Sequence, residues 1–267
     1  METVQRMVSA DGSVKRLHRL DDGEVVESVV IPHTTKTNMC ISTQAGCRMR
    51  CTFCATGKRF ARHLTADEIV GQVDEPVDSL VFMGMGEPLD NPNLIEAIER
   101  IKKEKGIASR KIVVSTVGLC DQVEKLLPTK VNIAFSVHAT TDEQRSKIMP
   151  INRKFPIAVL KNTMRELDVK LPSSRRLQIQ YIMIKGFNDT PDDAKRLAEL
   201  VPKNSLINLI PYNDTGAGFE PSAQEAIEIF KSEMRKHGFI CYVREPRGRD
   251  VAGACGMLAG APKPAQK

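Results

Sequence analysis

The stretch GCRMRCTFC, residues 46–54, places three cysteines within eight residues. Cys47, Cys51 and Cys54 follow the spacing C-x-x-x-C-x-x-C, and the whole chain has seven cysteines. The start of the chain, METVQRMVSADG, lacks the apolar core of a secretory leader. We therefore expect a cytoplasmic protein in which structural disulfides are disfavoured. Clustered thiols in such a protein indicate metal binding or cysteine chemistry.

The cysteine stretch follows the first of a series of strand-like segments. Helix-like segments separate these runs, and repeated strand–helix units predict an α/β fold with a parallel sheet. Six such units favour a partial (β/α)6 barrel, in which functional residues gather at the C-terminal ends of the strands. The predicted strands are 37–42, 79–85, 111–115, 131–137, 176–184 and 206–212, with a further short strand at 240–245.

Two kinds of signal mark the predicted helix starts. A hydroxyl residue three positions before a glutamate has the spacing of a capping box, and proline suits the first turn of a helix. The capping pairs are Thr65 with Glu68 and Ser222 with Glu225, and the prolines are Pro92 and Pro191.

The segment before the barrel has the pattern of a hairpin. SVKRLHRL and EVVESVVIP flank the turn-like Asp21, Asp22 and Gly23. We therefore expect an N-terminal β-hairpin extension over 1–36, a core over 37–260 that ends in a strand and loop extension, and a disordered tail over 261–267.

Composition and charge restrict the partners. The chain of 267 residues is 41% hydrophobic and 27% charged, which is typical of a soluble globular protein. No run approaches the roughly 18 apolar residues of a membrane helix, so we expect no membrane partner. Cationic residues surround the cysteines and could contact nucleic-acid phosphates, offset the charge of a cluster, or simply be solvated. They are Arg48, Arg50, Lys58, Arg59, Arg62 and His63.

Two metal sites fit three neighbouring thiols. A structural zinc ion normally has four protein ligands, and Cys40 or His63 could supply the fourth. A four-iron cluster with one iron left open for a small ligand also fits three thiolates. The sequence alone leaves both alternatives open.

A wider set of motifs resembles one family. The order of these motifs along the chain is similar to that in the radical S-adenosylmethionine (SAM) RNA adenine methyltransferases of the RlmN and Cfr type. The likeness extends from about Gly23 to about Gly260 and implies a radical SAM barrel. The motifs are CISTQAGCRMRCTFCATG (40–57), GMGEP (84–88), STVGL (115–119), FSVHA (135–139), KIMPIN (147–152), NLIPYN (208–213) and ACGML (254–258).

The resemblance implies two cofactors. Cys47, Cys51 and Cys54 would hold a 4Fe-4S cluster whose open iron binds SAM, and two SAM molecules would be used per turnover. GMGEP could otherwise be an ordinary glycine turn, and the polar strand ends could be merely capped. The SAM contacts implied by the motifs are Gly86, Glu87, Ser115, Ser136, Val137, His138 and Asn213.

The resemblance also gives roles to three residues outside the cysteine stretch. Cys255 lies between Gly253 and Gly256 in a loop-like sequence, where a thiol has freedom to reach more than one partner. The family likeness implies that Cys255 accepts a methyl group from SAM and that Cys40 releases the product by forming a disulfide with it. Glu27, on an otherwise apolar strand face, would be the proton acceptor, or else an edge-strand glutamate that reaches solvent.

These implications predict an enzyme that methylates an adenine carbon in ribosomal or transfer RNA during rRNA and tRNA processing. Carbon 2 is the position that the resemblance favours. The alternatives are carbon 8, another RNA, or a non-catalytic RNA-binding protein with a structural metal. We expect a monomer and an external electron donor such as flavodoxin. Arg249 and Gly253 depart from the family pattern, as does the short segment before Asp21, where members usually have a helical domain. Cys120, Cys241, His18, His33 and His237 are predicted to be structural.

Overall fold

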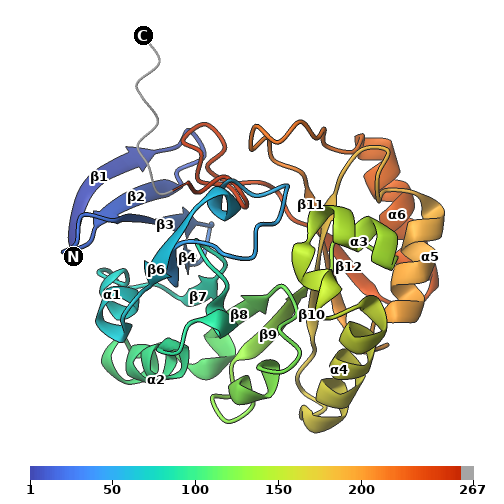
Figure 1. Cartoon of the computed structure of the whole chain (residues 1–267), viewed down its shortest axis with the longest axis horizontal. Helices are drawn as coiled ribbons and strands as arrows, with labels where there is room; N and C mark the ends of the chain where they lie inside the picture. The colour runs from blue at the N-terminus through green and yellow to red at the C-terminus, as the bar shows by residue number, and fades with distance from the viewer. Residues whose placement is uncertain (260–267) are drawn as a thin grey trace.

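Seven parallel strands form the centre of the fold in the computed structural model, which describes residues 1–259. Figure 1 shows them as a curved sheet with helices on its outer face. The expected partial barrel is therefore confirmed, and each predicted strand is present. The strands are β4 (Thr37–Cys40), β7 (Ser79–Phe82), β8 (Ile112–Thr116), β9 (Asn132–Ser136), β10 (Gln178–Met183), β11 (Leu206–Pro211) and β12 (Ile240–Val243), in this spatial order. The expected tail, 261–267, lies outside the described residues.

Helices join most of the parallel strands. The link between β8 and β9 contains only a 3-10 turn, η4 (Val123–Leu126), so one of the expected strand–helix units has no α-helix. The α-helices are α1 (Ala66–Gly71), α2 (Leu94–Glu104), α3 (Asp142–Ile148), α4 (Ile157–Lys170), α5 (Pro191–Leu200) and α6 (Gln224–Lys236). Further 3-10 turns are η1 (Ala55–Lys58), η2 (Pro88–Asp90), η3 (Ser109–Lys111) and η5 (Pro150–Arg153).

Helix α1 begins with the predicted capping box of Thr65 and Glu68, and Pro191 is the first residue of α5, as expected. The prediction for Ser222 was wrong. Helix α6 starts after Ala223 without a side-chain cap, because Ser222 is buried and its backbone amide donates to the β10 residue Met183. Pro92 was also misplaced, since it precedes the Asn93 cap of α2.

The predicted N-terminal hairpin is confirmed as β2 (Val14–Arg19) paired with β3 (Val25–Pro32). A third strand, β1 (Glu2–Val8), pairs with β2 and was not predicted. Nearly every β1 side chain is exposed, so its sequence carries none of the apolar alternation that marks a half-buried strand. Strand β3 then pairs antiparallel with β4, which joins this extension to the barrel sheet.

The cysteine stretch is held by a small separate hairpin, β5 (Gln44–Gly46) and β6 (Phe60–His63). The backbone amide of Cys47 donates to Arg59 at 2.7 Å, which closes the base of the loop. Gly46 has a φ of +84°, and a Cβ there would lie 2.1 Å from the Arg59 carbonyl oxygen. Only glycine allows this crossing, so Gly46 shapes the loop that carries the three thiols.

The C-terminal segment, 244–259, runs back across the barrel toward the N-terminal strands, as the red and blue segments of Figure 1 show. The Asp250 carboxylate accepts hydrogen bonds from Ser9 and from the Ala10 amide at 2.9 Å. Asp11 accepts from the Gly248 amide at 2.8 Å. These hydrogen bonds tie the segment that leads to Cys255 to the turn between β1 and β2.

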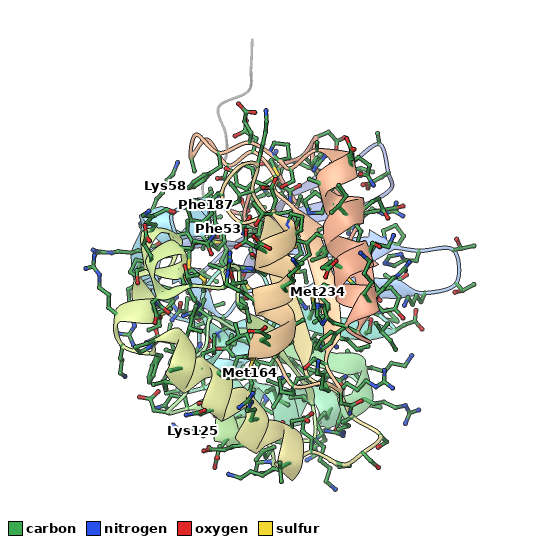
Figure 2. All side chains as sticks on the ribbon, turned by 90° about the vertical axis from the view of Figure 1, so that its right-hand side faces the viewer. Phe53, Lys58, Lys125, Met164, Phe187 and Met234 are labelled. Atoms are coloured by element: carbon green, nitrogen blue, oxygen red, sulfur yellow. The ribbon has the colours of Figure 1, made fainter. Side chains whose placement is uncertain are left out.

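The core fills the space between sheet and helices. Met164 of α4 and Met234 of α6 are fully buried there. Figure 2 shows Phe53, Lys58 and Phe187 near one end of the molecule and Lys125 at the other. Phe53 and Phe187 belong to a smaller apolar cluster beneath the cysteine loop. None of the helices within residues 1–259 has the length and apolar character that crossing a bilayer requires.

Candidate active site

Two adjoining cavities open at the C-terminal ends of the barrel strands. All three loop cysteines line the first cavity, together with Glu87, Ser115, Ser136 and His138. Cys40, His33, Arg244 and Arg247 line the second, whose volume is about 410 Å³. Cavities at this end of a barrel are the usual place for catalysis. The residues that line both cavities are Cys54, Thr56, Met83, Gly84, Ile210, Cys255 and Gly256.

The three loop cysteines are free thiols that face the same cavity. Burial raises the pKa of Cys47 to about 12 and that of Cys51 well above its usual value. A metal has to displace these protons when it binds. The loop is tied to the barrel near α3, where the Thr52 amide donates to Ile148 at 3.0 Å.

The two predicted metal sites place different demands on the three thiols. Within residues 1–259, no three His, Cys, Asp or Glu side chains are grouped so that one metal ion could be bound. A single zinc ion needs sulfurs about 2.3 Å from one centre. In a four-iron cluster each thiolate binds a different iron, so its sulfurs lie farther apart. Three free thiols around one cavity fit such a cluster.

Gly84 and Gly86 line the first cavity, but their lack of a side chain has a packing reason. A Cβ on Gly84 would lie 2.6 Å from the Ile41 carbonyl oxygen, and one on Gly86 would lie 2.7 Å from Gln44. Gly86 also has a φ of +104°. These glycines therefore let the loop after β7 pack on the segment after β4. Both glycines also line the cavity, so the SAM contact of Gly86 that the family motifs imply stays a prediction.

Glu87 is a buried carboxylate on the wall of the first cavity. Its Oε2 accepts from the Val117 amide at 2.8 Å and its Oε1 from the Leu89 amide at 3.2 Å. Burial raises the pKa of Glu87 to about 7. A cation bound beside it would stabilise the ionised form, so Glu87 fits an ammonium group.

Cys255 is an exposed thiol at the junction of the two cavities, whereas Cys40 is buried and lines only the second. Burial, and then the neighbouring Cys255, raise the pKa of Cys40 to about 12. All seven cysteines are free within the described chain, so the expected disulfide between Cys40 and Cys255 is not present in this structure. The two thiols nevertheless share one cavity wall although they are far apart in the sequence.

Comparisons with known proteins agree with this geometry. The model of the radical SAM superfamily matches residues 41–201. The chain is 47% identical over 265 residues to the dual-specificity RNA methyltransferase RlmN of Geobacter sulfurreducens, covering 95% of this chain and 73% of that protein. It is 43% identical to RlmN 2 of Myxococcus xanthus, with coverages of 94% and 72%.

The chain belongs to the RlmN family of radical SAM methyltransferases. Its fold also matches the crystal structure of a radical SAM methyltransferase from Sphaerobacter thermophilus. The TM-score is 0.93 at 34% identity, and the match covers 97% of this chain and 81% of that one. Membership in this family also confirms the expected cofactors, a 4Fe-4S cluster and SAM.

Most of the SAM contacts implied by the family motifs lie together. Ser115 and Ser136 are on neighbouring strands, with their hydroxyl oxygens 3.3 Å apart. His138 has a φ of +60°, and its Nδ1 accepts from the Ile182 amide at 3.1 Å, so the ring hydrogen of the neutral form is on Nε2. Burial lowers the pKa of His138 to about 3, which keeps the ring neutral. All three residues line the first cavity.

Val137 and Asn213 are placed differently. The Val137 side chain is fully buried, and this residue is not among those lining either cavity in the described chain. Asn213 lines the second cavity and donates from Nδ2 to the Cys255 carbonyl oxygen at 3.1 Å. In this structure Asn213 therefore contacts the loop that carries Cys255, and its expected contact with SAM remains a prediction.

Gln180 of β10 is a site residue that the sequence reading missed. It is opposite Ser136 in the sheet and extends the polar row of Ser115 and Ser136 into the first cavity. Its side chain is buried, with 2% exposed, and neither amide atom has a hydrogen-bond partner within residues 1–259. An unpaired buried amide is costly and suits a ligand with both a donor and an acceptor. In the sequence it sits in LQIQYIMI, where it looks like an ordinary strand residue.

Glu27 does not reach solvent, which excludes the edge-strand alternative. It is fully buried, forms an ion pair with Lys15 at 3.0 Å and accepts from the Ala259 amide at 3.3 Å. Lys15 also donates to the Ala252 carbonyl at 3.2 Å. Glu27 is not one of the described residues that line either cavity. Its position is therefore beneath the C-terminal segment, next to the site.

The cationic loop is less available for phosphates than its sequence predicts. Arg48 is paired with Asp90, Arg59 with Glu24, and Arg62 with both Asp22 and Glu68. Arg50 and Lys58 are exposed and make no side-chain hydrogen bond or ion pair within the described part of the chain. These two cations are the ones that remain free for an anionic partner.

Proposed function

We propose that this protein methylates carbon 2 of an adenine in ribosomal or transfer RNA, with Cys255 as the carrier of the methyl group. The support for an RNA substrate is the name of its relatives, which are dual-specificity RNA methyltransferases. The observation that carries the proposal is the position of Cys255 between the cavity that contains the three loop cysteines and a second cavity that contains Cys40.

The first cavity fits the cofactors. Cys47, Cys51 and Cys54 would hold the cluster, and Glu87 would pair with the amino group of SAM. When bound, the cluster and SAM would supply the one-electron chemistry that removes a hydrogen atom from a methyl group on Cys255. The polar row of Ser115, Ser136 and Gln180 offers hydrogen bonds to the rest of SAM.

The second cavity fits the base to be modified. Adenine carbons 2 and 8 are not nucleophilic, so the methyl group first has to be attached to the protein. The Cys255 sulfur bonds to the methyl carbon of one SAM, and the carbon–sulfonium bond of that SAM breaks. After loss of that hydrogen atom, the carbon on Cys255 bonds to the base and joins RNA to the protein. The adduct radical then loses one proton, and one electron that the bound cluster would accept. The base must be unstacked to enter.

Cys40 completes the cycle. Its thiolate bonds to the Cys255 sulfur, and the bond between that sulfur and the methylene carbon breaks with its electron pair on the carbon. That carbon then takes up a proton to become the methyl group, and the methylated base leaves. An external reductant then reopens the disulfide. Glu27 accepts the proton that the adduct loses. Because Lys15 and the Ala259 amide already bind its carboxylate, the C-terminal segment has to move before Glu27 can act.

We further propose that the protein acts as a cytoplasmic monomer that receives electrons from a donor such as flavodoxin. The decisive experiment is mass spectrometry of nucleosides from RNA treated with the reconstituted protein and SAM labelled in its methyl group. We expect labelled 2-methyladenosine. Labelled 8-methyladenosine would show that the methylated position is carbon 8 and not carbon 2. If neither ribosomal nor transfer RNA contained a labelled nucleoside, the proposed RNA substrate would be wrong.

A further inference from the structure

Arg249, Asn213 and Cys255 form a chain of hydrogen bonds at the rim of the second cavity. Arg249 Nε donates to Asn213 Oδ1 at 2.8 Å, and Asn213 Nδ2 donates to the Cys255 carbonyl oxygen at 3.1 Å. Arg249 is exposed, whereas Asn213 is buried. The chain therefore connects the protein surface to the backbone of the residue that is proposed to carry the methyl group.

The direction of these bonds is fixed by chemistry. A guanidinium can only donate and a backbone carbonyl can only accept. The Asn213 amide must therefore turn its oxygen to Arg249 and its nitrogen to Cys255. Without Arg249 the buried amide loses its oxygen partner and the reason to keep this orientation.

The rest of the loop shows what this contact adds. On one side of Cys255, the Gly253 amide donates to Gly248 at 2.7 Å. On the other side, the Gly256 carbonyl accepts from the Ala55 amide at 2.8 Å. Asn213 supplies the hydrogen bond to Cys255 itself, at the point where the loop passes between the two cavities.

We propose that Arg249 is a positioning residue that holds Cys255 at the junction of the cavities by orienting the Asn213 amide. That this placement of Cys255 serves methyl transfer rests on the proposed function. That Arg249 and Asn213 hold the Cys255 backbone in place does not depend on it. Arg249 acts through Asn213 and has no direct part in the chemistry.

The test uses hydrogen exchange of the 267-residue chain without RNA, so that an RNA contact of Arg249 cannot contribute. Arg249→Met removes the first bond. Asn213→Asp keeps a partner for Arg249 but cannot donate to Cys255. We expect both variants to speed exchange of the Met257 amide, which donates to Ala254 across Cys255 at 3.0 Å, by about tenfold. Arg235→Met, an exposed arginine on α6, is the control.

Two further readouts separate positioning from a general loss of structure. Arg249→Lys retains a cationic donor and should restore most of the protection. In the reconstituted enzyme, Arg249→Met should slow methylation of Cys255, followed by mass spectrometry, without changing the KM for SAM. Unchanged exchange in both variants, or a change in Arg249→Met alone, would overturn the proposal. If wild-type Cys255 carries no methyl group, the proposed function fails, while the exchange result still decides the role of Arg249.

Discussion

Cys40 and Cys255 line the same cavity, and Cys255 also lines the cavity that contains the three loop cysteines. One thiol therefore has access to both compartments and the other to one. Under the proposed function this asymmetry assigns the roles. Cys255, which lines both cavities, carries the methyl group, and Cys40, which lines one, releases the methylated base.

Replacing Cys40 should trap the reaction. Cys40→Ala should still accept a methyl group on Cys255 and still attack the base, because the first cavity is unaffected. No thiolate then displaces the Cys255 sulfur, so a covalent protein–RNA adduct should accumulate on denaturing gels. The adduct should vanish in Cys40→Ala/Cys255→Ala and be absent in Cys241→Ala, a buried cysteine on β12. Normal turnover by Cys40→Ala would contradict the assignment.

Product release should be faster at higher pH. Burial is the main cause that raises the pKa of Cys40, to about 12 in the free protein, and it persists in the adduct, where Cys255 carries no charge. Little thiolate is therefore present near neutrality. Below that pKa the thiolate fraction rises about tenfold per pH unit, and release should follow it between about pH 7 and 9. Rapid-quench measurement of adduct decay in a single turnover checks this slope. Decay that does not change with pH would show that a proton acceptor acts on Cys40.

Metal content should follow the loop cysteines. Cys51→Ala removes one of the three thiols on the cavity wall, so the reconstituted protein should lose iron and cleave no SAM. Cys120→Ala, outside both cavity walls in the described chain, should retain both properties. Iron, zinc and sulfide analysis after anaerobic purification gives the answer. Stoichiometric zinc without iron in the wild-type protein would revive the structural zinc site.

Salt dependence should identify the cations that contact RNA. Each phosphate contact to a single strand adds about 0.7 to the slope of log affinity against log salt. Arg50→Gln/Lys58→Gln should therefore lower the slope by about 1.4, because these cations have no carboxylate partner in the described chain. Arg48→Gln should leave it nearly unchanged, since Arg48 is paired with Asp90. Equal effects of the two changes would refute this distinction.

Gln180 should oppose stability and favour cofactor binding. Gln180→Leu removes a buried amide that has no partner among residues 1–259, so the cofactor-free protein should melt at the same or a higher temperature. The same change should weaken SAM binding to the reconstituted protein by about tenfold or more. Calorimetric titration and thermal unfolding give the two quantities. Unchanged SAM affinity would remove Gln180 from the binding site.

Local sequence rules succeeded where one short-range interaction decides the outcome. The capping box of Thr65 and Glu68 starts α1 because both partners lie within one turn. The same spacing failed at Ser222, whose backbone is drawn into a contact with Met183 of β10, far away in the sequence. Strand β1 escaped prediction because it is an exposed strand without alternating burial.

Residue types and their separation along the chain were enough to predict the available chemistry: the spacing of three thiols, the order of the motifs, the family and the barrel. Which of these groups meet could be seen only in the folded chain. It brought Cys40 and Cys255 to one cavity, paired most of the loop arginines with carboxylates and left the Gln180 amide unsatisfied. Each of these outcomes depends on contacts between distant segments, because burial and charge pairing are set by packing in three dimensions.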